Sequence, residues 1–327
     1  MSPPTEIVAG DIGGTNARFA LAEIADGQVI KLHDSARFLT RDHASLASSW
    51  RAFEAKLGRK LPRAAAIAVA CPVTGDILKL TNNPWVIRPA TLADELGIDR
   101  LTLINDFGAI GHAVPQLTPP HLHHVAGPEH DLPPEGVISV IGPGTGLGAA
   151  LVLRRAGHTH VIECEGGHAD FSALDELEDA MLRILRRRFT RVSVERLVSG
   201  PGLRNIYECL GEIEGKPVRL GDDAALWTQA IEGSDTLAAA SLGRFCRSLG
   251  AFAGDLALSQ GANAVVIAGG IVPRLAHLLP HSGFAERFVA KGRFERMMSE
   301  IPVKLITHPQ PGLLGVAAAF AAAHRNG

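Results

Sequence analysis

Residues 8–18 carry residue types that bind phosphate, placed between two apolar runs. Three glycines, Asp11, Thr15 and Asn16 fall in this stretch, and the simplest structure is two strands joined by a tight glycine turn. Successive N–H groups of such a turn form a concavity that binds anions. Asp11, at the end of the first strand, could hold a Mg²⁺ ion or its water, because hard cations prefer oxygen ligands. The alternative is a plain hairpin in which Asp11 bonds its own turn.

A second glycine turn, Gly144-Thr145-Gly146, follows a strand expected at 137–141. It repeats the first pattern, so Gly14-Thr15 would align with Gly144-Thr145 in an internal duplication. Two such turns could hold one nucleotide from both sides. The chain has no GxxxxGKS/T pattern, which excludes a P-loop. A Rossmann site is the alternative because residues 144–149 satisfy GxGxxA, although residues 150–154 favour a strand where that site needs a helix.

Asn105 and Asp106 follow a buried strand expected at 101–104 and precede a helix. In α/β sheets, ligands bind beyond the carboxyl ends of the strands. A carboxylate there can take a proton from a substrate hydroxyl while that oxygen attacks phosphorus. The alternative is a helix N-cap, a role that Asn and Asp fill well, and the dipeptide alone favours the cap.

Glu165-Gly166-Gly167-His168 could bind a small polyol, because Glu165 accepts hydrogen bonds, His168 donates or accepts them, and the glycines let the loop lie close to a ligand. An exposed turn with solvated side chains is the alternative. Glu195, which follows Ser193, is typical of an acidic residue in the first turn of a helix, where the helix dipole stabilises it. Gly269 and Gly270 follow another expected strand and could let an adenine ring lie flat on the backbone.

The composition excludes several classes of protein. A net charge of −2 and a pI of about 6.7 leave no basic field for nucleic acid. The four cysteines form no CxxC pair, which predicts no zinc framework and fits a reducing compartment. His121, His123 and His124 suggest a metal, but they lie in a proline-flanked stretch that we expect to be exposed. We find no signal-peptide pattern and no run of transmembrane length, so we expect a soluble, cytoplasmic protein.

The 327 residues suggest two domains, and the apolar periodicity predicts α/β units with mixed sheets. We interpret the proline-rich residues 115–134 as a linker or excursion between the two halves. Besides the strands of the first hairpin, the expected strands are 29–38, 64–70, 101–104, 137–141, 149–154, 160–164, 264–268 and 303–306. The expected helices are 45–57, 91–96 (capped by Thr91), 173–189, 193–197, 202–210, 235–259 and 312–324.

Taken together, these motifs resemble those of the bacterial ATP-dependent glucokinases that lack a zinc motif. The resemblance runs nearly end to end, and the ordered set is specific although several members are weak singly. The motifs are Asp11-Ile12-Gly13-Gly14-Thr15-Asn16-Ala17-Arg18, Ala70-Cys71-Pro72-Val73-Thr74-Gly75, Thr81-Asn82, Ile104-Asn105-Asp106-Phe107, Gly144-Thr145-Gly146-Leu147-Gly148, Glu165-Gly166-Gly167-His168, Ser199-Gly200-Pro201-Gly202, Ala268-Gly269-Gly270-Ile271-Val272-Pro273-Arg274 and Pro311-Gly312-Leu313-Leu314-Gly315.

The resemblance implies transfer of the γ-phosphoryl of Mg·ATP to the 6-hydroxyl of glucose, the reaction that starts glycolysis. It implies an actin/hexokinase-like α/β fold of two ribonuclease-H-like domains flanking a central cleft. We expect a small domain of residues 1–110 and 311–327 and a large domain of residues 111–310. A homodimer is also implied. No structural zinc is expected, because residues 169–188 contain no cysteine.

The resemblance also implies residue roles. Asp106 would be the general base, and Asp11 would position Mg²⁺ through water. The sugar hydroxyls would bind Asn105, Asp106, Glu165, His168 and Glu195, with Asn82 nearby. The phosphates would meet Gly13, Gly14, Thr15 and Asn16 on one side and Gly144, Thr145 and Gly146 on the other, and Gly269 and Gly270 would line the adenosine pocket.

Overall fold

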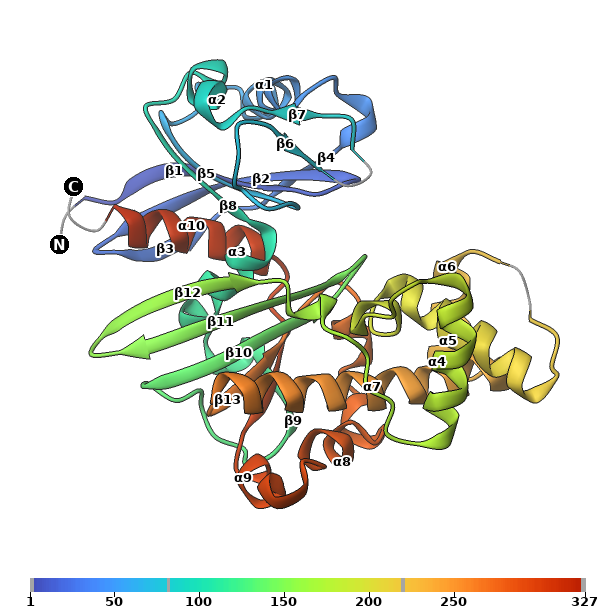
Figure 1. Ribbon diagram of the computed structural model, residues 1–327. Coiled ribbons are helices and arrows are strands. Elements are labelled where there is room, and N and C mark those ends of the chain that lie inside the picture. Colours follow the sequence, from blue (N-terminus) through green and yellow to red (C-terminus); the bar gives the residue numbers. More distant parts are fainter. Residues whose placement is uncertain (1–2, 81–82, 219–220, 325–327) are drawn as a thin grey trace. The chain divides into compact units, whose positions relative to one another are not determined.

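The computed structural model describes residues 3–80, 83–218 and 221–324, and the chain divides into two compact units. Unit 1 comprises residues 1–118, 161–163 and 308–327, and unit 2 comprises residues 119–160 and 164–307. Figure 1 shows strands and helices in both units, which is the α/β class expected from the sequence.

Unit 1 is built on a mixed sheet in the order β3-β2-β1-β5-β8, with β4 paired to β2. Strands β1 and β2 are antiparallel, whereas β1, β5 and β8 run parallel. Its strands are β1 (Thr5–Ile12), β2 (Asn16–Ala25), β3 (Gln28–Leu32), β4 (Ala36–Leu39), β5 (Ala64–Val69), β6 (Leu78–Lys79), β7 (Val86–Ile87) and β8 (Arg100–Asn105). Its α-helices are α1 (Leu46–Leu57), α2 (Pro89–Leu96), α3 (Asp106–Ala113) and α10 (Pro311–Ala323).

Strand β5 shows how the sequence builds the layers of unit 1. All of its residues are buried, as expected for a strand covered on both faces. The alanines at 64, 66 and 68 pack against α10, and the small side chains let this alanine-rich helix lie close to the sheet. Ala65, Ile67 and Val69 point the other way, into a core with Trp50 and Phe53 of α1.

Unit 2 is built on a sheet in the order β12-β11-β10-β13-β14-β9. Its strands are β9 (Leu122–Ala126), β10 (Gly136–Pro143), β11 (Leu147–Arg155), β12 (His158–Cys164, of which residues 161–163 group with unit 1), β13 (Ala264–Ile267) and β14 (Val303–Ile306). Its α-helices are α4 (Glu176–Arg188), α5 (Gly200–Glu214), α6 (Asp223–Glu232), α7 (Thr236–Gln260), α8 (Phe284–Val289) and α9 (Glu295–Ser299). Two 3₁₀ helices, η4 (Gly166–His168) and η5 (Val194–Arg196), matter for the site.

The two sheets share one topology. In each, an antiparallel hairpin (β1-β2 or β10-β11) is followed by two strands parallel to its first strand (β5 and β8, or β13 and β14). This agreement supports the internal duplication suggested by the two Gly-Thr turns. Because the glycine turn at 144–146 leads into antiparallel β11 and not into a helix, the Rossmann alternative is wrong.

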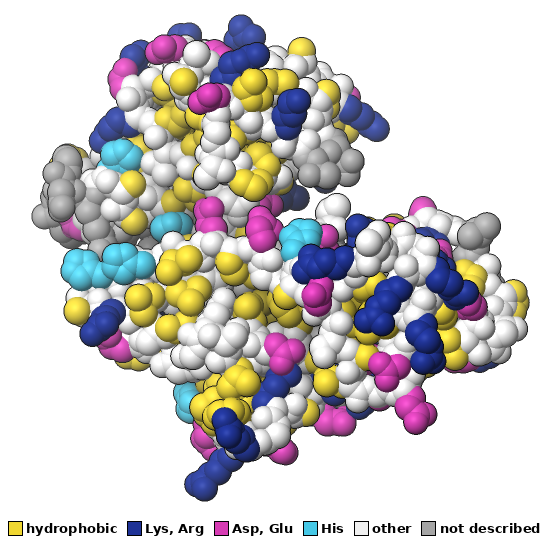
Figure 2. All heavy atoms as spheres, in the orientation of Figure 1, with side chains coloured by type: hydrophobic (Ala, Val, Ile, Leu, Met, Phe, Trp, Pro, Cys, Tyr) yellow, Lys and Arg dark blue, Asp and Glu magenta, His cyan; other side chains and the backbone are white. Residues whose placement is uncertain are grey.

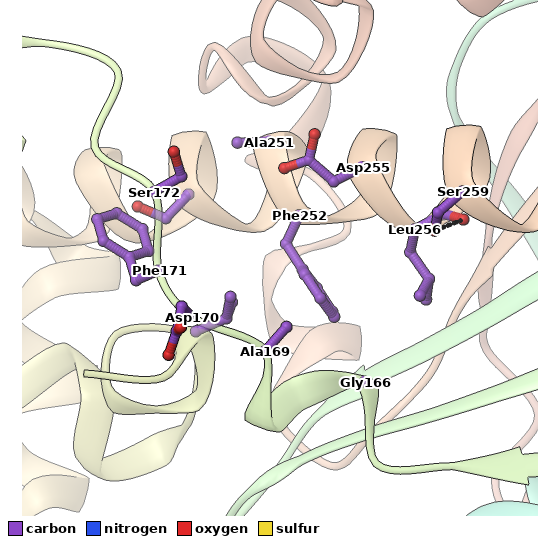
Figure 3. Close-up of a pocket in the computed structure, with 12 residues that line it drawn as sticks. Gly166, Ala169, Asp170, Phe171, Ser172, Ala251, Phe252, Asp255, Leu256 and Ser259 are labelled. Carbon is purple, nitrogen blue, oxygen red and sulfur yellow. Dashed lines mark hydrogen bonds between the residues drawn. The ribbon is translucent and has the colours of Figure 1, made fainter. Parts of the chain in front are cut away.

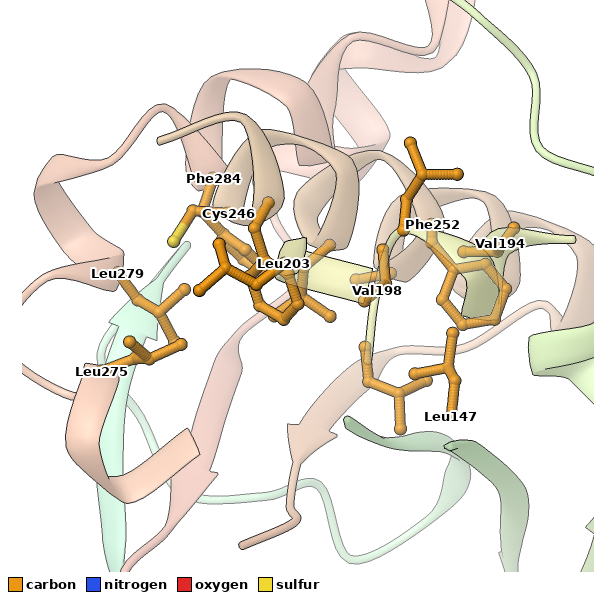
Figure 4. Packing of buried hydrophobic residues seen from close by; sticks show 14 of the residues in the cluster. Leu147, Val194, Val198, Leu203, Cys246, Phe252, Leu275, Leu279 and Phe284 are labelled. Carbon is orange, nitrogen blue, oxygen red and sulfur yellow. The ribbon is translucent and has the colours of Figure 1, made fainter. Parts of the chain in front are cut away.

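The core of unit 2 lies around the long helix α7, which begins after the N-cap Asp235. Figure 4 shows Val194, Val198, Phe252 and Leu147 gathered at one end of this core. The core therefore supports both the segment that carries Glu195 and the first residue after the second glycine turn.

Two expectations about local structure are wrong, and a third is incomplete. The linker or excursion expected at 115–134 contains the division between the two units, after residue 118, but it also contains β9, which pairs with β14 far along the chain. The single strand expected at 29–38 is two strands, β3 and β4, which both pair with β2. Helix α2 begins at Pro89 and not after Thr91, because proline is well suited to the first helical position.

One face of the molecule carries no dominant sign of charge (Figure 2). On the face drawn in Figure 2, Lys and Arg side chains are interspersed with Asp and Glu side chains. Among the described helices, none is long and apolar enough to cross a membrane.

We expect His112 in α3 to make the protein less stable in mild acid. Burial lowers the pKa of His112 below its usual value of 6.5, so the unfolded chain binds this proton more readily than the folded chain. Stability is thus lost as the pH falls below about 6.5. His112→Gln should narrow the difference in Tm between about pH 7.5 and pH 5.5. The exposed His130→Gln is the control, and an equal change in both variants would contradict this role.

Candidate active site

The first glycine turn, Gly13-Gly14-Thr15, lies between β1 and β2 of unit 1. Its carbonyl groups are held from outside the turn: Thr40 Oγ1 donates to Gly14 O at 2.9 Å, and Thr40 N donates to Thr15 O at 3.0 Å. Within the described chain, the N–H groups of Gly14 and Thr15 have no protein acceptor. Such a turn fits an anion, as the sequence predicts.

Asn16 and Asp11, the two polar residues that flank this turn, have different surroundings. Asn16 begins β2, and its Oδ1 already accepts a hydrogen bond from Arg37 Nε at 2.7 Å. Asp11 lies opposite Arg18 in the β1-β2 hairpin, with Arg18 Nη1 at 3.3 Å from Asp11 Oδ2. Burial raises the pKa of Asp11 despite this partner, so the fold leaves its negative charge incompletely compensated.

The end of β8 places Asn105 and Asp106 at the start of α3. Asn105 caps the helix: its Oδ1 accepts hydrogen bonds from Phe107 N at 2.8 Å and Gly108 N at 3.2 Å, and its Nδ2 donates to Cys71 O at 3.2 Å. The N-cap interpretation is therefore correct for Asn105, and it leaves Asp106 as the first helical residue. Burial and, to a smaller extent, the charge of Asp106 raise the pKa of the Cys71 thiol.

Sequence reasoning missed one residue beside the start of α3, Glu163. Its Oε1 accepts a hydrogen bond from Asn105 N at 3.3 Å, and a Cβ at Gly108 would overlap the same carboxylate. Glu163 comes two residues before Glu165, but no local pattern distinguishes it from other exposed strand residues. It belongs to the surroundings of the proposed base.

The second glycine turn, Gly144-Thr145-Gly146, lies between β10 and β11 of unit 2. The N-terminus of α5 contacts it, with Gly200 N donating to Gly144 O at 2.7 Å. Gly269 is also close: it has a φ of +105°, and a Cβ there would overlap Pro143 O at the end of β10. Gly269 and Gly270 follow β13, so unit 2 brings the predicted phosphate turn and the predicted adenosine loop to the same sheet edge.

The same unit brings together three predicted sugar ligands. His168 Nε2 lies 3.9 Å from Glu165 Oε2 and 3.9 Å from Glu195 Oε2. Glu195 Oε2 also accepts a hydrogen bond from Leu147 N at 2.9 Å, directly after the second glycine turn. A polar cluster of one imidazole and two carboxylates therefore adjoins the predicted phosphate site, although the three residues are up to 30 positions apart.

A short backbone ladder fixes His168 relative to Glu195. Phe171 N donates to Val192 O at 3.0 Å, and Val194 N donates to Ala169 O at 2.9 Å. Arg191, which the sequence did not single out, adds a hydrogen bond from its Nη2 to His168 O at 2.6 Å. The ladder links η4, which carries His168, to η5, which carries Glu195.

The Glucokinase family model matches residues 8–323, which is nearly the whole chain. This chain belongs to the glucokinase family. A curated glucokinase from Zymomonas mobilis is 62% identical to it over 97% of this chain and 98% of that protein.

Solved structures of other glucokinases have the same fold. The glucokinase from an Antarctic psychrotroph has a TM-score of 0.83 and 34% identity, over 96% of this chain and 98% of that one. The glucokinase from Balamuthia mandrillaris, solved in complex with glucose, has a TM-score of 0.77 and 21% identity, over 97% of this chain and 94% of that one. The two α/β units are those of an actin-like ATPase fold, as the resemblance implies.

Asn82 lies outside the described residues. His123 and His124 are half-buried and not exposed as expected, because they lie in β9, which pairs with β14. Within the described residues, no group of three or more His, Cys, Asp or Glu side chains could hold a metal ion.

We expect Gly167→Ala to weaken sugar binding selectively. A Cβ at Gly167 would overlap Leu147 O, so η4 would have to move and carry His168 with it. The KM for glucose should rise at least about tenfold, the value of one charged hydrogen bond, with the KM for ATP nearly unchanged. Gly243→Ala is the matched control, because a Cβ there meets no atom within 4 Å. An unchanged glucose KM would show that η4 does not position a sugar ligand.

Proposed function

We propose that this protein transfers the γ-phosphoryl group of ATP to the 6-hydroxyl of glucose, giving glucose 6-phosphate and ADP. The single observation that carries the proposal is that the carboxylates of Glu165 and Glu195 both lie near His168 Nε2. Glu195 also accepts a hydrogen bond from Leu147 N, directly after the second glycine turn. The names of the relatives support glucose as the acceptor. The alternative is an actin-like, nucleotide-dependent binding or sensor protein that has lost phosphoryl transfer, and such a protein would have no use for this cluster.

The cluster suits a polyol because its members differ in hydrogen-bonding capacity. Glu165 and Glu195 accept hydrogen bonds from sugar hydroxyls, while His168 donates or accepts according to its tautomer. Asn105 keeps one Nδ2 hydrogen besides its bond to Cys71 and can donate it to the sugar. A site of this kind discriminates strongly against analogues that lack a hydroxyl, because its polar groups would be left unpaired.

Asp106 is the proposed general base. It takes the proton of the 6-hydroxyl as that oxygen forms its bond to the γ-phosphorus and the bond from phosphorus to the β,γ-bridging oxygen breaks. The proton then rests on the Asp106 carboxylate and leaves to solvent when the product departs. The neutral Cys71 thiol nearby keeps its own proton, because its pKa is raised.

The surroundings of Asp11 fit a divalent cation. Its carboxylate supplies oxygen ligands, and burial raises its pKa although Arg18 lies beside it, which supports a further cation near this carboxylate. We propose that Asp11 positions Mg²⁺ through water, and Mg²⁺ would neutralise the phosphate oxygens of the donor. Gly13, Gly14, Thr15 and Asn16 would meet these phosphates in unit 1. Gly144, Thr145 and Gly146 would meet them in unit 2, with Gly269 and Gly270 along the adenosine.

Three broader expectations are part of the same proposal. We propose a small domain of residues 1–110 and 311–327 and a large domain of residues 111–310. We also propose that the protein acts as a homodimer in the cytoplasm. The four cysteines, all unpaired in the structure, support a reducing compartment.

The role of Glu195 tests the sugar site directly. Glu195→Gln should raise the KM for glucose by about 10- to 100-fold, because a hydrogen bond to a charged acceptor contributes about 1.5–3 kcal/mol. The KM for ATP should stay within about twofold. The exposed Glu232→Gln in α6 is the control. If the two variants had the same glucose KM, Glu195 would not be a sugar ligand.

A further inference from the structure

Unit 2 contains a cavity of about 260 Å³ that the proposed reaction does not use. It lies between α7 and the segment 169–172 that follows η4. Figure 3 shows Phe252 and Leu256 projecting from α7 toward Ala169 and Gly166. Because Gly166 lines the cavity and begins η4, the wall of the cavity is continuous with the loop that carries His168.

The wall is apolar except for a few groups. Phe171, Val194, Ala251, Phe252 and Leu256 supply aromatic and aliphatic surface. The buried Ser248, only 1% exposed, also lines the cavity, and its Oγ has no hydrogen-bond partner among the described residues. A buried hydroxyl without a partner is unfavourable and is satisfied when a ligand supplies a donor or acceptor.

The two carboxylates of the wall are already paired with cations. Asp170 Oδ1 lies 2.5 Å from Arg191 Nε, and Asp255 Oδ1 lies 2.7 Å from Lys291 Nζ. A cationic ligand would therefore have to displace an existing ion pair. A phosphorylated ligand would meet two acidic side chains and no unpaired base of the wall, so its charge is disfavoured.

The cavity also borders the two segments that hold the sugar ligands. Phe171 and Ala169 belong to one side of the backbone ladder, and Val194, beside Glu195, belongs to the other. A ligand that fits the cavity in this arrangement stabilises the ladder. It thereby favours the conformation in which His168 lies 3.9 Å from both Glu165 and Glu195.

We propose that this cavity is an effector site for a small neutral molecule with an aromatic or branched aliphatic body and one hydrogen-bonding group facing Ser248. Its volume is below that of pockets for drug-sized ligands, which matches a body of one or two rings. The bound molecule lowers the KM for glucose by holding the ladder in its sugar-binding form. This part of the proposal rests on the proposed function.

Indole is a suitable probe, because it is neutral, has two fused rings and donates one hydrogen bond. Ligand-observed NMR on the full-length protein should show binding in about the millimolar range, as expected for so small a ligand. Ser248→Ala should weaken it about five- to tenfold without lowering Tm, since the hydroxyl has no protein partner to lose. Ser259→Ala is the matched control, because Ser259 Oγ already donates to Leu256 O at 3.0 Å. Ala251→Leu should block binding by filling the cavity.

Saturating indole should lower the glucose KM of the wild-type protein about threefold or more, with kcat and the KM for ATP nearly unchanged. Ala251→Leu should abolish this response. Absence of indole binding, or binding that both Ser248→Ala and Ala251→Leu leave intact, would overturn the site. Binding without a change in glucose KM would overturn the coupling. Failure of the wild-type protein to form glucose 6-phosphate would instead overturn the proposed function together with the coupling, while the indole titration would still decide the site.

Discussion

Asp106→Asn is expected to lower kcat by about 10²–10⁴ while leaving the KM for glucose nearly unchanged. The asparagine has the same shape and can still bond the sugar hydroxyl, but it cannot take the proton. Asn105 supplies the side-chain cap of α3, so the helix should keep its start in the variant. Steady-state kinetics with glucose 6-phosphate as the measured product would give both constants.

The matched control is Asp94→Asn, which changes an exposed aspartate in α2 of the same unit. It should leave kcat within about twofold of the wild-type value. A wild-type kcat in Asp106→Asn would remove Asp106 from the role of base. A large rise in glucose KM with little change in kcat would make Asp106 a sugar ligand only.

Glu178→Ala is expected to give the largest loss of stability. Glu178 is fully buried in α4, and its carboxylate accepts hydrogen bonds from Arg287 Nη2 at 2.8 and 3.0 Å and from Arg244 Nη1 at 3.2 Å. Removing it leaves Arg287, itself buried, with only the more distant carboxylate of Asp175, whose Oδ2 lies 3.6 Å from Arg287 Nη1. Breaking a buried pair from one side costs about 3–5 kcal/mol, which should lower the Tm of a unit of this size by about 10 °C.

Two controls separate the lost ion pair from other effects. Glu176→Ala removes an exposed carboxylate two positions away in α4 and should change the free energy of unfolding by less than about 0.5 kcal/mol. The double variant Glu178→Met with Arg287→Met removes both charges and should recover most of the loss, because no unpaired arginine remains at that position. Equal Tm values for Glu178→Ala and Glu176→Ala would contradict the account. Calorimetry or denaturant unfolding would measure each effect.

Much of the fold could be predicted because its signals are local. Ser45 caps α1 and Asp235 caps α7, where polar residues precede an apolar helical face. The strand expected at 303–306 is found at those residues as β14. Strand β9 was missed because its pairing with β14 joins segments nearly 180 residues apart, and such pairing leaves no local pattern beside the prolines.

The candidate site, like the fold, could be predicted from the sequence only in part. The sequence could single out Glu165, His168 and Glu195 from their motifs, but only the fold shows that both glutamates lie near one imidazole nitrogen. Arg191 and Glu163 were missed because each acts on a neighbour that is distant in sequence, and an isolated arginine or glutamate is usually a solvated surface residue. The parts of the site that depend on tertiary contacts between distant segments therefore cannot be predicted from local sequence patterns alone.

The central claim is coupled transfer from ATP to glucose. The most direct test is to incubate the purified protein with Mg·ATP, with and without glucose, and to measure ADP and glucose 6-phosphate in the same samples. We predict that ADP forms only when glucose is present, and that each ADP is matched by one glucose 6-phosphate. ADP formation that ignores glucose, or that yields no sugar phosphate, would contradict the account and would withdraw the sugar-binding roles of Glu165, His168 and Glu195.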